Sequence, residues 1–263
     1  MIPYFDPPSI QLGGITVHAY GLLVLLGLTT GTLLALGAAF WRKLPLWPVA
    51  MSGVLFPFFA LIGGHFAYVL MYRLDEALDR PSLWLEVWAG MSSVGVLPLW
   101  GFTAVVMMLI AGFRKLTAQL DVFAIGWAAA WTIGRFGCFL VHDHPGVATD
   151  FFLGVQGICE AQRSYSYTTS GACHDLGLYE MLGCGMLFLT AAASFVLRLR
   201  PGLSAAAVLI GYGVLRLGLE PLRVDWEPLH VVSALMYLLG GGLVLAAAVT
   251  IPKRWPEQPA AKS

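Results

Sequence analysis

Long apolar runs dominate the sequence and decide which folds are open to it. A helix needs about 20 apolar residues to cross a hydrocarbon core about 30 Å thick. Seven segments approach or exceed that length, at residues 17–39, 49–72, 96–113, 121–141, 180–199, 203–219 and 229–251. The sequence therefore predicts an all-α polytopic membrane protein with seven transmembrane helices.

The composition excludes several other classes of protein. Hydrophobic residues make up 58% of the 263-residue chain and charged residues only 11%, which is more apolar surface than a soluble fold can bury. The 15 basic residues are matched by 15 acidic ones, so a basic nucleic-acid-binding surface is not expected. The apolar runs lack the alternation of a transmembrane β-barrel. Residues 1–16 contain no Lys or Arg, so the first run is not expected to be a cleaved signal peptide.

Basic residues in the short connections predict the orientation of the chain. Nine of the 15 follow the first, third, fifth and seventh runs: Arg42, Lys43, Arg114, Lys115, Arg198, Arg200, Lys253, Arg254 and Lys262. Because such residues are retained in the cytoplasm, the N-terminus is expected outside and the C-terminus inside. We expect a single seven-helix domain over residues 1–251, with outer-side loops 73–95 and 142–179 and a cytoplasmic tail 252–263.

Two arginines lie inside predicted membrane spans. A charged residue there costs about 2.5–3.5 kcal/mol on insertion scales, so it is a candidate functional residue. Arg135 is flanked by small residues, and Arg216 shares a helix face with Glu220 and Arg223 at i, i+4 and i+7. One interpretation is a structural ion pair between Arg216 and Glu220. The other is a positive pocket formed by both arginines that binds a phospholipid phosphate.

Further polar candidates lie at the outer ends of the spans. The run His142-Asp143-His144 before Pro145 has three interpretations: acid–base chemistry, a metal site completed by His174-Asp175, or a solvated turn. His18 and Tyr20 begin the first span, where they fit either an interfacial aromatic belt or a substrate site. The same two possibilities apply to His65 and Tyr68.

The four cysteines fall into two groups. Cys138 and Cys184 lie within spans, where we expect them to pack as small apolar residues. Cys159 and Cys173 share an outer loop, and an oxidising compartment favours a disulfide between them, although a free thiol is the alternative.

Several motifs together resemble those of the bacterial phosphatidylglycerol–prolipoprotein diacylglyceryl transferase family. They are spread over most of the chain: Phe5-Asp6-Pro7, His18-Ala19-Tyr20-Gly21, Gly63-Gly64-His65-Phe66-Ala67-Tyr68-Val69-Leu70, Val87-Trp88-Ala89-Gly90-Met91-Ser92, Gly134-Arg135-Phe136-Gly137-Cys138-Phe139, Leu178-Tyr179-Glu180 and Tyr212-Gly213-Val214-Leu215-Arg216. The family topology is also seven spans with the N-terminus outside. The pattern departs from the family's at five positions, namely Val94 where the family has His, Cys138 and Val141 where it has Asn, His65 where it has Arg, and Asp143 where it has Glu.

The resemblance implies an enzyme of the bacterial inner membrane, with its active site toward the outer leaflet. Its substrates would be phosphatidylglycerol and the cysteine thiol of a prolipoprotein that carries a signal peptide, and glycerol phosphate would leave. Arg135 and Arg216 would hold the departing phosphate. His142 or His144 would deprotonate the thiol, with Asp143 orienting the base. No metal or cofactor is required.

The remaining members of the expected substrate-binding set are Tyr20, His18, Glu180 and Glu220. Tyr20 and Glu180 would shape the headgroup pocket. Two other functions stay open. A relative that only binds phospholipid would keep both arginines. An intramembrane metal-dependent hydrolase would use His142, Asp143, His144 and His174. A retinal protein is disfavoured because residues 229–251 contain no Lys.

Overall fold

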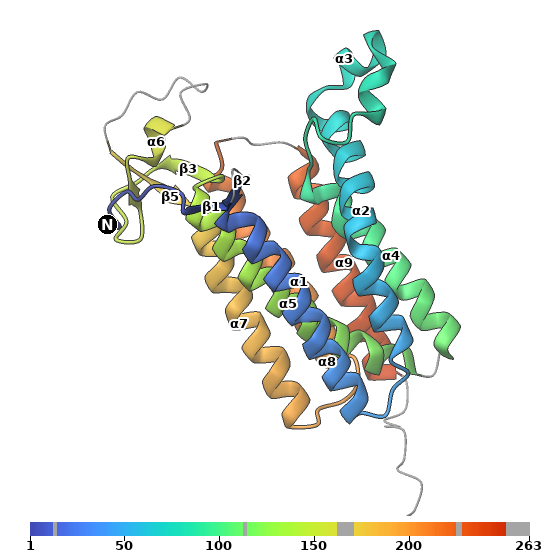
Figure 1. Cartoon of the computed structure of the whole chain (residues 1–263). Coiled ribbons are helices and arrows are strands. Elements are labelled where there is room, and N and C mark those ends of the chain that lie inside the picture. The colour runs from blue at the N-terminus through green and yellow to red at the C-terminus, as the bar shows by residue number, and fades with distance from the viewer. Residues whose placement is uncertain (13–14, 113–114, 162–170, 225–227, 251–263) are drawn as a thin grey trace, which may run out of the picture.

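The structure is a computed structural model that describes residues 1–12, 15–112, 115–161, 171–224 and 228–250. A bundle of long helices carries smaller elements at one end (Figure 1). The long helices are α1 (Ala19–Trp41), α2 (Trp47–Tyr72), α4 (Ser93–Gly112), α5 (Leu116–Val141), α7 (Leu176–Val196), α8 (Leu203–Leu219) and α9 (Pro228–Thr250). The smaller elements are β1 (Ser9–Leu12), β2 (Ile15–His18), α3 (Leu74–Asp79), η1 (Pro81–Leu85), β3 (Pro145–Ala148), β4 (Val155–Gln156), α6 (Ile158–Ala161), β5 (Ala172–Asp175) and η3 (Glu220–Leu222).

Each predicted span corresponds to one long helix, with ends within five residues of those expected. Within the described residues, six helices are long and apolar enough to cross a membrane: α1, α2, α5, α7, α8 with η3, and α9. The remaining predicted span, residues 96–113, folds as α4. The helix therefore exists where the sequence predicts it, and its passage through the bilayer stays a prediction.

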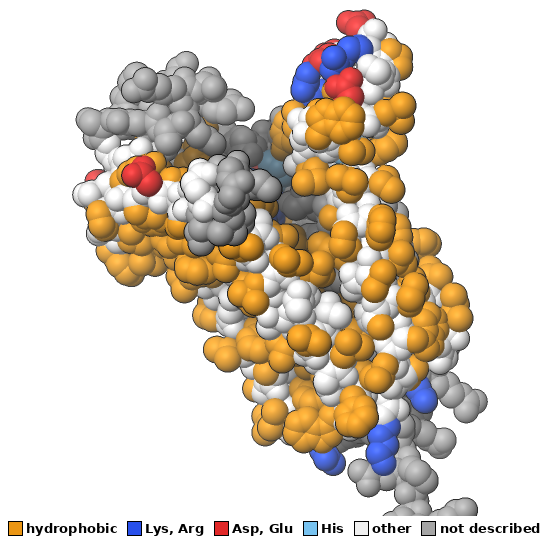
Figure 2. Space-filling model, viewed as in Figure 1, with side chains coloured by type: hydrophobic (Ala, Val, Ile, Leu, Met, Phe, Trp, Pro, Cys, Tyr) orange, Lys and Arg blue, Asp and Glu red, His pale blue; other side chains and the backbone are white. Residues whose placement is uncertain are grey.

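The surface of the bundle is suited to lipid. Large apolar side chains are exposed along the long helices, among them Leu25, Leu33, Phe58, Leu189 and Leu239. Figure 2 shows hydrophobic side chains over the middle of the molecule, with charged side chains gathered near its two ends. A solvent of lipid tails leaves such side chains in an apolar medium, so the membrane class predicted from composition is consistent with the surface.

The elements at one end of the bundle come from the two predicted outer loops and the N-terminus. Residues 73–95 form α3 and η1, and residues 142–179 supply a three-stranded antiparallel sheet of order β3-β5-β4. A disulfide joins Cys159 of α6 to Cys173 of β5, as one of the two interpretations of these cysteines predicted. We call this end of the bundle the sheet end (Figure 1).

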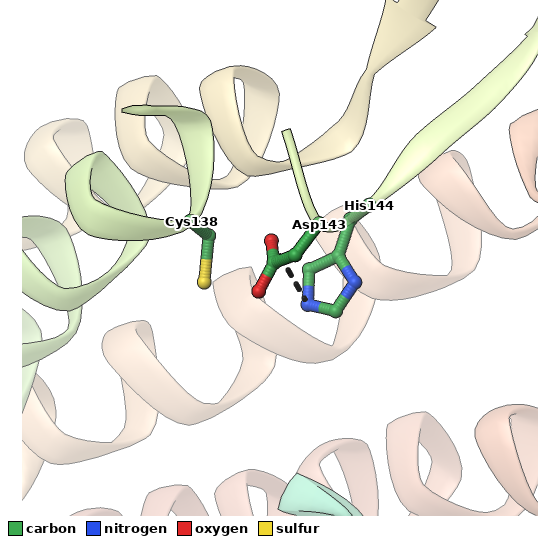
Figure 3. Close-up of side chains that lie close together, drawn as sticks. All are labelled: Cys138, Asp143 and His144. Carbon is green, nitrogen blue, oxygen red and sulfur yellow. Dashed lines mark ion pairs between the residues drawn. The ribbon is translucent and has the colours of Figure 1, made fainter. Parts of the chain in front are cut away.

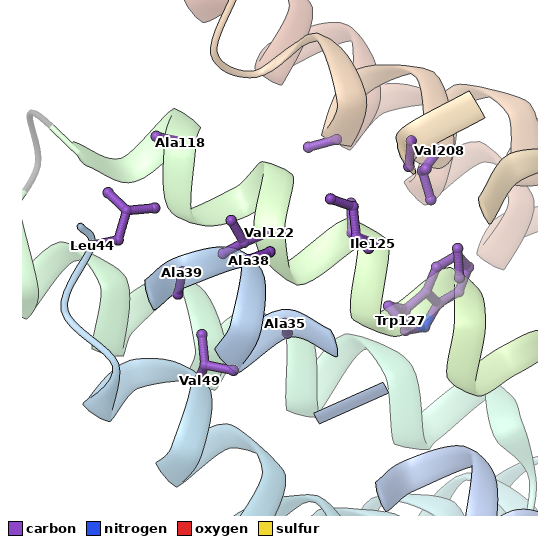
Figure 4. Close-up of a cluster of buried hydrophobic side chains, with 14 of the residues drawn as sticks. Ala35, Ala38, Ala39, Leu44, Val49, Ala118, Val122, Ile125, Trp127 and Val208 are labelled. Atoms are coloured by element: carbon purple, nitrogen blue, oxygen red, sulfur yellow. The ribbon is translucent and has the colours of Figure 1, made fainter. Parts of the chain in front are cut away.

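Helix α5 is the centre of the bundle. Half of its most apolar window is buried, against 22% for α1 and for α9, and it packs against α1, α7 and α8. The buried core follows its length from Ala118 and Val122 to Trp127, with Ala35 of α1 and Val208 of α8 opposite (Figure 4). The helix begins at Leu116, before the expected residue 121, so Asp121 lies inside it.

Asp121 fixes α8 against α5 at the end opposite the sheet. Its buried carboxylate accepts hydrogen bonds from the backbone N–H groups of Gly202, at 2.8 Å, and Ala205, at 2.9 Å. These donors belong to the first turn of α8, whose N–H groups have no partner within the helix. A carboxylate at a helix N-terminus also opposes the positive end of the helix dipole.

Glycines bring α1 and α5 into backbone contact. A Cβ atom on Gly126 of α5 would lie 2.4 Å from the carbonyl oxygen of Gly31 and 2.8 Å from Cβ of Ala35 on α1. Small residues allow this approach, which substitutes for the hydrophobic driving force that lipid removes.

We expect Gly126→Ala to destabilise the protein by about 1–3 kcal/mol, because the new methyl group overpacks the contact between α1 and α5. The measurement is thermal unfolding in detergent. Gly37→Ala is the matched control, since a Cβ atom there has no neighbour within 4 Å and Ala favours a helix by up to about 1 kcal/mol. Equal unfolding temperatures for the two variants would contradict the close approach.

Candidate functional site

One buried carboxylate binds both of the arginines predicted from the sequence. Arg135 Nε lies 2.8 Å from Glu180 Oε2, and Arg216 Nη1 lies 2.8 Å from Glu180 Oε1. All three residues are buried: Arg135 is 4% exposed, Glu180 1% and Arg216 5%. We call Arg135, Glu180 and Arg216 the Arg–Glu–Arg cluster. The arginines do converge, and the acid that contacts Arg216 comes from α7.

The cluster forms because three helices meet at the sheet end of the bundle. Arg135 lies in the last two turns of α5, Glu180 in the first two turns of α7 and Arg216 in the last turn of α8. Gly177 allows α7 to approach the end of α5, because a Cβ atom there would lie 2.8 Å from the backbone nitrogen of Phe139.

Aromatic side chains complete the surroundings of the carboxylate. The Tyr212 hydroxyl donates a hydrogen bond to Glu180 Oε2 at 3.2 Å, and Trp131 Nε1 donates to the Tyr212 hydroxyl at 2.9 Å. The Arg135 guanidinium lies 5.2 Å from the centre of the Trp131 ring, within the range of a cation–π contact. No role for Tyr212 is predicted from the sequence, although it lies one helical turn before Arg216.

A second group of charged and polar side chains is centred on Glu220 of η3. Glu220 Oε2 lies 3.6 Å from Arg223 Nε, and Glu220 Oε1 lies 3.4 Å from His230 Nδ1. The Tyr72 hydroxyl lies 3.4 Å from the other ring nitrogen of His230. Glu220 thus contacts Arg223 and His230, while Arg216 contacts Glu180, so the interpretation of Arg216 and Glu220 as an ion pair is wrong. Two guanidinium groups with one carboxylate leave the Arg–Glu–Arg cluster with a net positive charge.

The chain reverses direction at His142, directly after α5. His142 has a left-handed backbone with φ 49°, and its N–H donates to the Phe139 carbonyl at 3.3 Å. The Asp143 N–H donates to the Cys138 carbonyl at 3.4 Å. These two bonds form a Schellman motif, which turns the chain back over the last turn of the helix.

The reversal divides the His142-Asp143-His144 run. His142 Nδ1 lies 3.0 Å from Asp175 Oδ2, and the ring packs against Phe5 with 4.4 Å between ring centres. Asp175 Oδ1 also accepts from the Leu178 N–H at 3.1 Å and so caps α7. His142 therefore faces the sheet.

Asp143 and His144 lie on the other side, toward Cys138 and Arg135. His144 Nε2 is 3.8 Å from Asp143 Oδ1. Burial, and then the positive charge of Arg135, lowers the pKa of His144 to about 3. Burial raises the pKa of Asp143 to about 6, although Arg135 opposes that change. The imidazole is therefore neutral near pH 7, and the carboxylate is largely ionised.

Three side chains here could hold a metal ion. The Cys138 thiol, an Asp143 carboxylate oxygen and a His144 ring nitrogen all lie within 4.8 Å of one another, and Figure 3 shows the three side chains directed toward one another. The set differs from the one expected for a metal, because His174 lies 2.7 Å from the Tyr179 hydroxyl. Cys138, expected to be an apolar packing residue, accepts a contact from Arg135 Nη1 at 3.7 Å.

The other expected site residues lie near the edge of this region or beyond it. Tyr20 is 40% exposed in the first turn of α1, and a Cβ atom on Gly137 would lie 3.3 Å from its ring. The His18 side chain lies outside the described residues. His65 is buried between two carbonyl oxygens, 2.9 Å from that of Leu83 and 3.1 Å from that of Gly90, so it joins α2 to the residues around η1.

The fold and the site together define a class: an integral membrane protein with a buried cationic cluster where its helices meet extramembrane loops. Comparison with known proteins narrows this class. Residues 7–252 match the family described as prolipoprotein diacylglyceryl transferase, so the chain belongs to that family.

Curated relatives named phosphatidylglycerol–prolipoprotein diacylglyceryl transferase share low identity over long alignments. The protein of Psychrobacter arcticus is 28% identical over 254 residues, which cover 84% of this chain and 82% of the relative. The protein of Photobacterium profundum is 29% identical over 267 residues, or 95% of this chain and 96% of the relative. The similarity therefore extends through the helices that carry the Arg–Glu–Arg cluster.

We expect Glu180→Gln to destabilise the folded protein by about 3–5 kcal/mol, because it leaves two buried guanidinium groups without a carboxylate. The measurement is the thermal unfolding of purified protein in detergent. Glu76→Gln, which removes the carboxylate from a surface ion pair with Arg73, is the control and is expected to change stability little. Unfolding at the wild-type temperature for Glu180→Gln would contradict this account of the cluster.

Proposed function

We propose that this protein transfers the diacylglyceryl group of phosphatidylglycerol to the cysteine thiol of a prolipoprotein and releases glycerol phosphate. The observation that carries the proposal is the Arg–Glu–Arg cluster, in a chain that belongs to the prolipoprotein diacylglyceryl transferase family. The family's name supplies the reaction, and the cluster supplies a site for the anionic group that such a reaction must bind.

The two guanidinium groups suit the leaving phosphate. Glu180 occupies one N–H of each arginine and holds both groups in place, and a guanidinium has five N–H donors. The remaining donors can bind phosphate oxygens, and the excess positive charge stabilises the negative charge that grows as the carbon–oxygen bond breaks. Arginine cannot lose its proton here, so the charge is present at every physiological pH.

Removal of the thiol proton is the second task of the reaction, since an unperturbed thiol has a pKa near 8.5. We assign this task to Asp143 and His144, which lie beside Arg135. His142 takes a positioning role, because its bond to Asp175 holds the reversed chain. Tyr20, His18 and Glu220 complete the proposed substrate-binding set, with Tyr20 placed on the exposed edge of α1.

The orientation of the protein follows from the same proposal. We infer that α4 also crosses the membrane, which brings the number of spans to seven. We infer further that residues 1–251 form one domain and that residues 252–263 form a cytoplasmic tail. The connections after α1 and α7 carry Arg42, Lys43, Arg198 and Arg200 at the end opposite the sheet, which supports a cytoplasmic location for that end. The site would then face the outer leaflet of a bacterial inner membrane, where the signal peptide of a translocated prolipoprotein lies.

Arg135→Ala is expected to lower diacylglyceryl transfer at least about 100-fold, because one of the two donors to the departing phosphate is lost. The assay follows the mass gain of a prolipoprotein acceptor in membranes that contain phosphatidylglycerol. Arg80→Ala, on the exposed segment between α3 and η1, is the control and retains activity.

Complementation of a bacterial strain depleted of its own transferase is the corresponding test in cells. Growth is expected with the wild-type chain and not with Arg135→Ala. Undiminished transfer by Arg135→Ala would refute the assignment of the site. Phosphatidylglycerol binding by the wild-type chain without any transfer would favour the alternative of a lipid-binding relative.

A further inference from the structure

Cys138, Asp143 and His144 form a compact set of three different metal-ligating side chains. Their ligand atoms all lie within 4.8 Å of one another, and the Asp143–His144 distance is 3.8 Å. Figure 3 shows the sulfur, the carboxylate and the imidazole directed at a common region. Among the described residues, no other group of three His, Cys, Asp or Glu side chains brings its ligand atoms this close together.

The backbone, and not a chance meeting of side chains, brings the set together. Cys138 is in the last turn of α5, and the Schellman motif returns the next residues over that turn through the Asp143 N–H bond to the Cys138 carbonyl. The side-chain bond between His142 and Asp175 of β5 also holds the reversed chain in place. Asp143 and His144 are therefore presented to Cys138 by a defined turn.

The distances suit a zinc ion after a small adjustment. Zinc binds sulfur at about 2.3 Å and nitrogen or oxygen at about 2.0–2.2 Å, in tetrahedral geometry. Ligand atoms around one zinc are then about 3.3–3.6 Å apart, so the most distant pair must move together by about 1 Å. Rotation of the Asp143 and His144 side chains, which are 36% and 31% exposed, can supply that movement.

The type of ligand favours zinc over other common ions. A thiolate with an imidazole and a carboxylate suits a borderline-soft ion, whereas magnesium and calcium prefer oxygen alone. Three protein ligands are typical of a catalytic zinc, which keeps its fourth position open.

Charge is the main objection to a cation here, because Arg135 Nη1 lies 3.7 Å from the Cys138 sulfur. Glu180 cancels one of the two charges in the Arg–Glu–Arg cluster, and Asp143 can offset the other. Zinc itself would displace the thiol proton of Cys138, because a coordinated thiol binds as the thiolate. The anionic ligands Cys138 and Asp143 would therefore balance the charge of the zinc ion.

We propose that Cys138, Asp143 and His144 bind a zinc ion whose open position takes the thiol of the acceptor protein. This inference rests on the proposed function and specifies the part of Asp143 and His144 in removing the thiol proton: they would act as ligands of the zinc, and not as bases that take up the proton themselves. Zinc-bound thiols lose their proton at neutral pH, so no separate base is needed.

The transfer step then balances as follows. The acceptor thiol binds zinc and releases its proton to water. The sulfur attacks the glyceryl carbon that is bonded to the phosphate oxygen, a sulfur–carbon bond forms, and the carbon–oxygen bond breaks. The electron pair of that bond goes to the phosphate oxygen, and glycerol phosphate leaves as a dianion beside Arg135 and Arg216. No oxidant or reductant is involved.

Metal analysis of the full-length protein in detergent tests the site. After incubation with zinc and removal of excess, the wild-type chain is expected to keep about one ion. Cys138→Ala, Asp143→Asn and His144→Ala are each expected to lower zinc affinity at least about tenfold. Cys184→Ala removes a buried cysteine outside the set and is the matched control. Arg135→Ala is expected to retain zinc while it loses transfer.

Cobalt substitution tests the thiol ligand and the open position. Cobalt-loaded protein is expected to show a sulfur-to-cobalt absorption band that Cys138→Ala lacks. An acceptor peptide with its cysteine is expected to change the band, and the same peptide with serine is not.

The results separate the failure of each proposal. Failure of the wild-type chain to bind zinc or cobalt, or equal binding by all three ligand variants, would overturn the metal site and leave the transferase proposal standing if transfer persists. Zinc bound by these three residues in a protein without transfer activity would confirm the site and overturn the proposed function. A cobalt absorption band that neither peptide changes would overturn the proposal that the acceptor thiol binds at the open position.

Discussion

The carboxylate of Glu180, shared by two guanidinium groups, is the interaction on which the rest of the site depends. Charges removed from water are costly unless they are paired at close range. Glu180 meets this requirement for Arg135 and Arg216 at once, and Tyr212 donates to it as well. Because Arg135, Glu180 and Arg216 come from three different helices, the same contacts join α5, α7 and α8 and leave an excess of positive charge at their meeting point.

The two ends of α8 are fixed to α5 by different kinds of bond. At one end the Asp121 carboxylate accepts from the first turn of α8, and at the other the Arg–Glu–Arg cluster holds the last turn. Between them Tyr212 packs edge-on against Trp127, with 5.0 Å between ring centres. These contacts join the three helices into one unit, and the more exposed α1 and α9 pack against α5 and α8. A phosphate site needs such a unit, because its donors must keep their positions as the transferred charge grows.

The sequence predicts those parts of the structure that depend only on one segment of the chain and on the lipid or water around it. The apolar runs gave all seven long helices, since a bilayer requires each span to satisfy its own backbone hydrogen bonds. Arg135 and Arg216 could be recognised because charge within a span is costly. The resemblance placed Glu180 in the headgroup pocket, but its role as the shared partner of both arginines could not be foreseen. Helix periodicity favours Glu220, four residues from Arg216, whereas Glu180 reaches both arginines only after α7 packs beside α5. The left-handed turn at His142 was equally hidden, since no glycine marks it, and without that turn Cys138 looks like an ordinary apolar packing residue.

That turn also connects the two halves of the proposed chemistry. Through its backbone, His142 turns Asp143 and His144 toward Cys138. Through its ring, it binds Asp175, whose other oxygen caps the helix that carries Glu180. A displacement of α7 would therefore move the arginines of the proposed phosphate site and the side chains of the proposed thiol site together. In the proposed reaction, attack on carbon requires the sulfur and the leaving phosphate to lie on opposite sides of one atom, and the linkage through Asp175 would hold the two proposed groups of side chains in a constant relation.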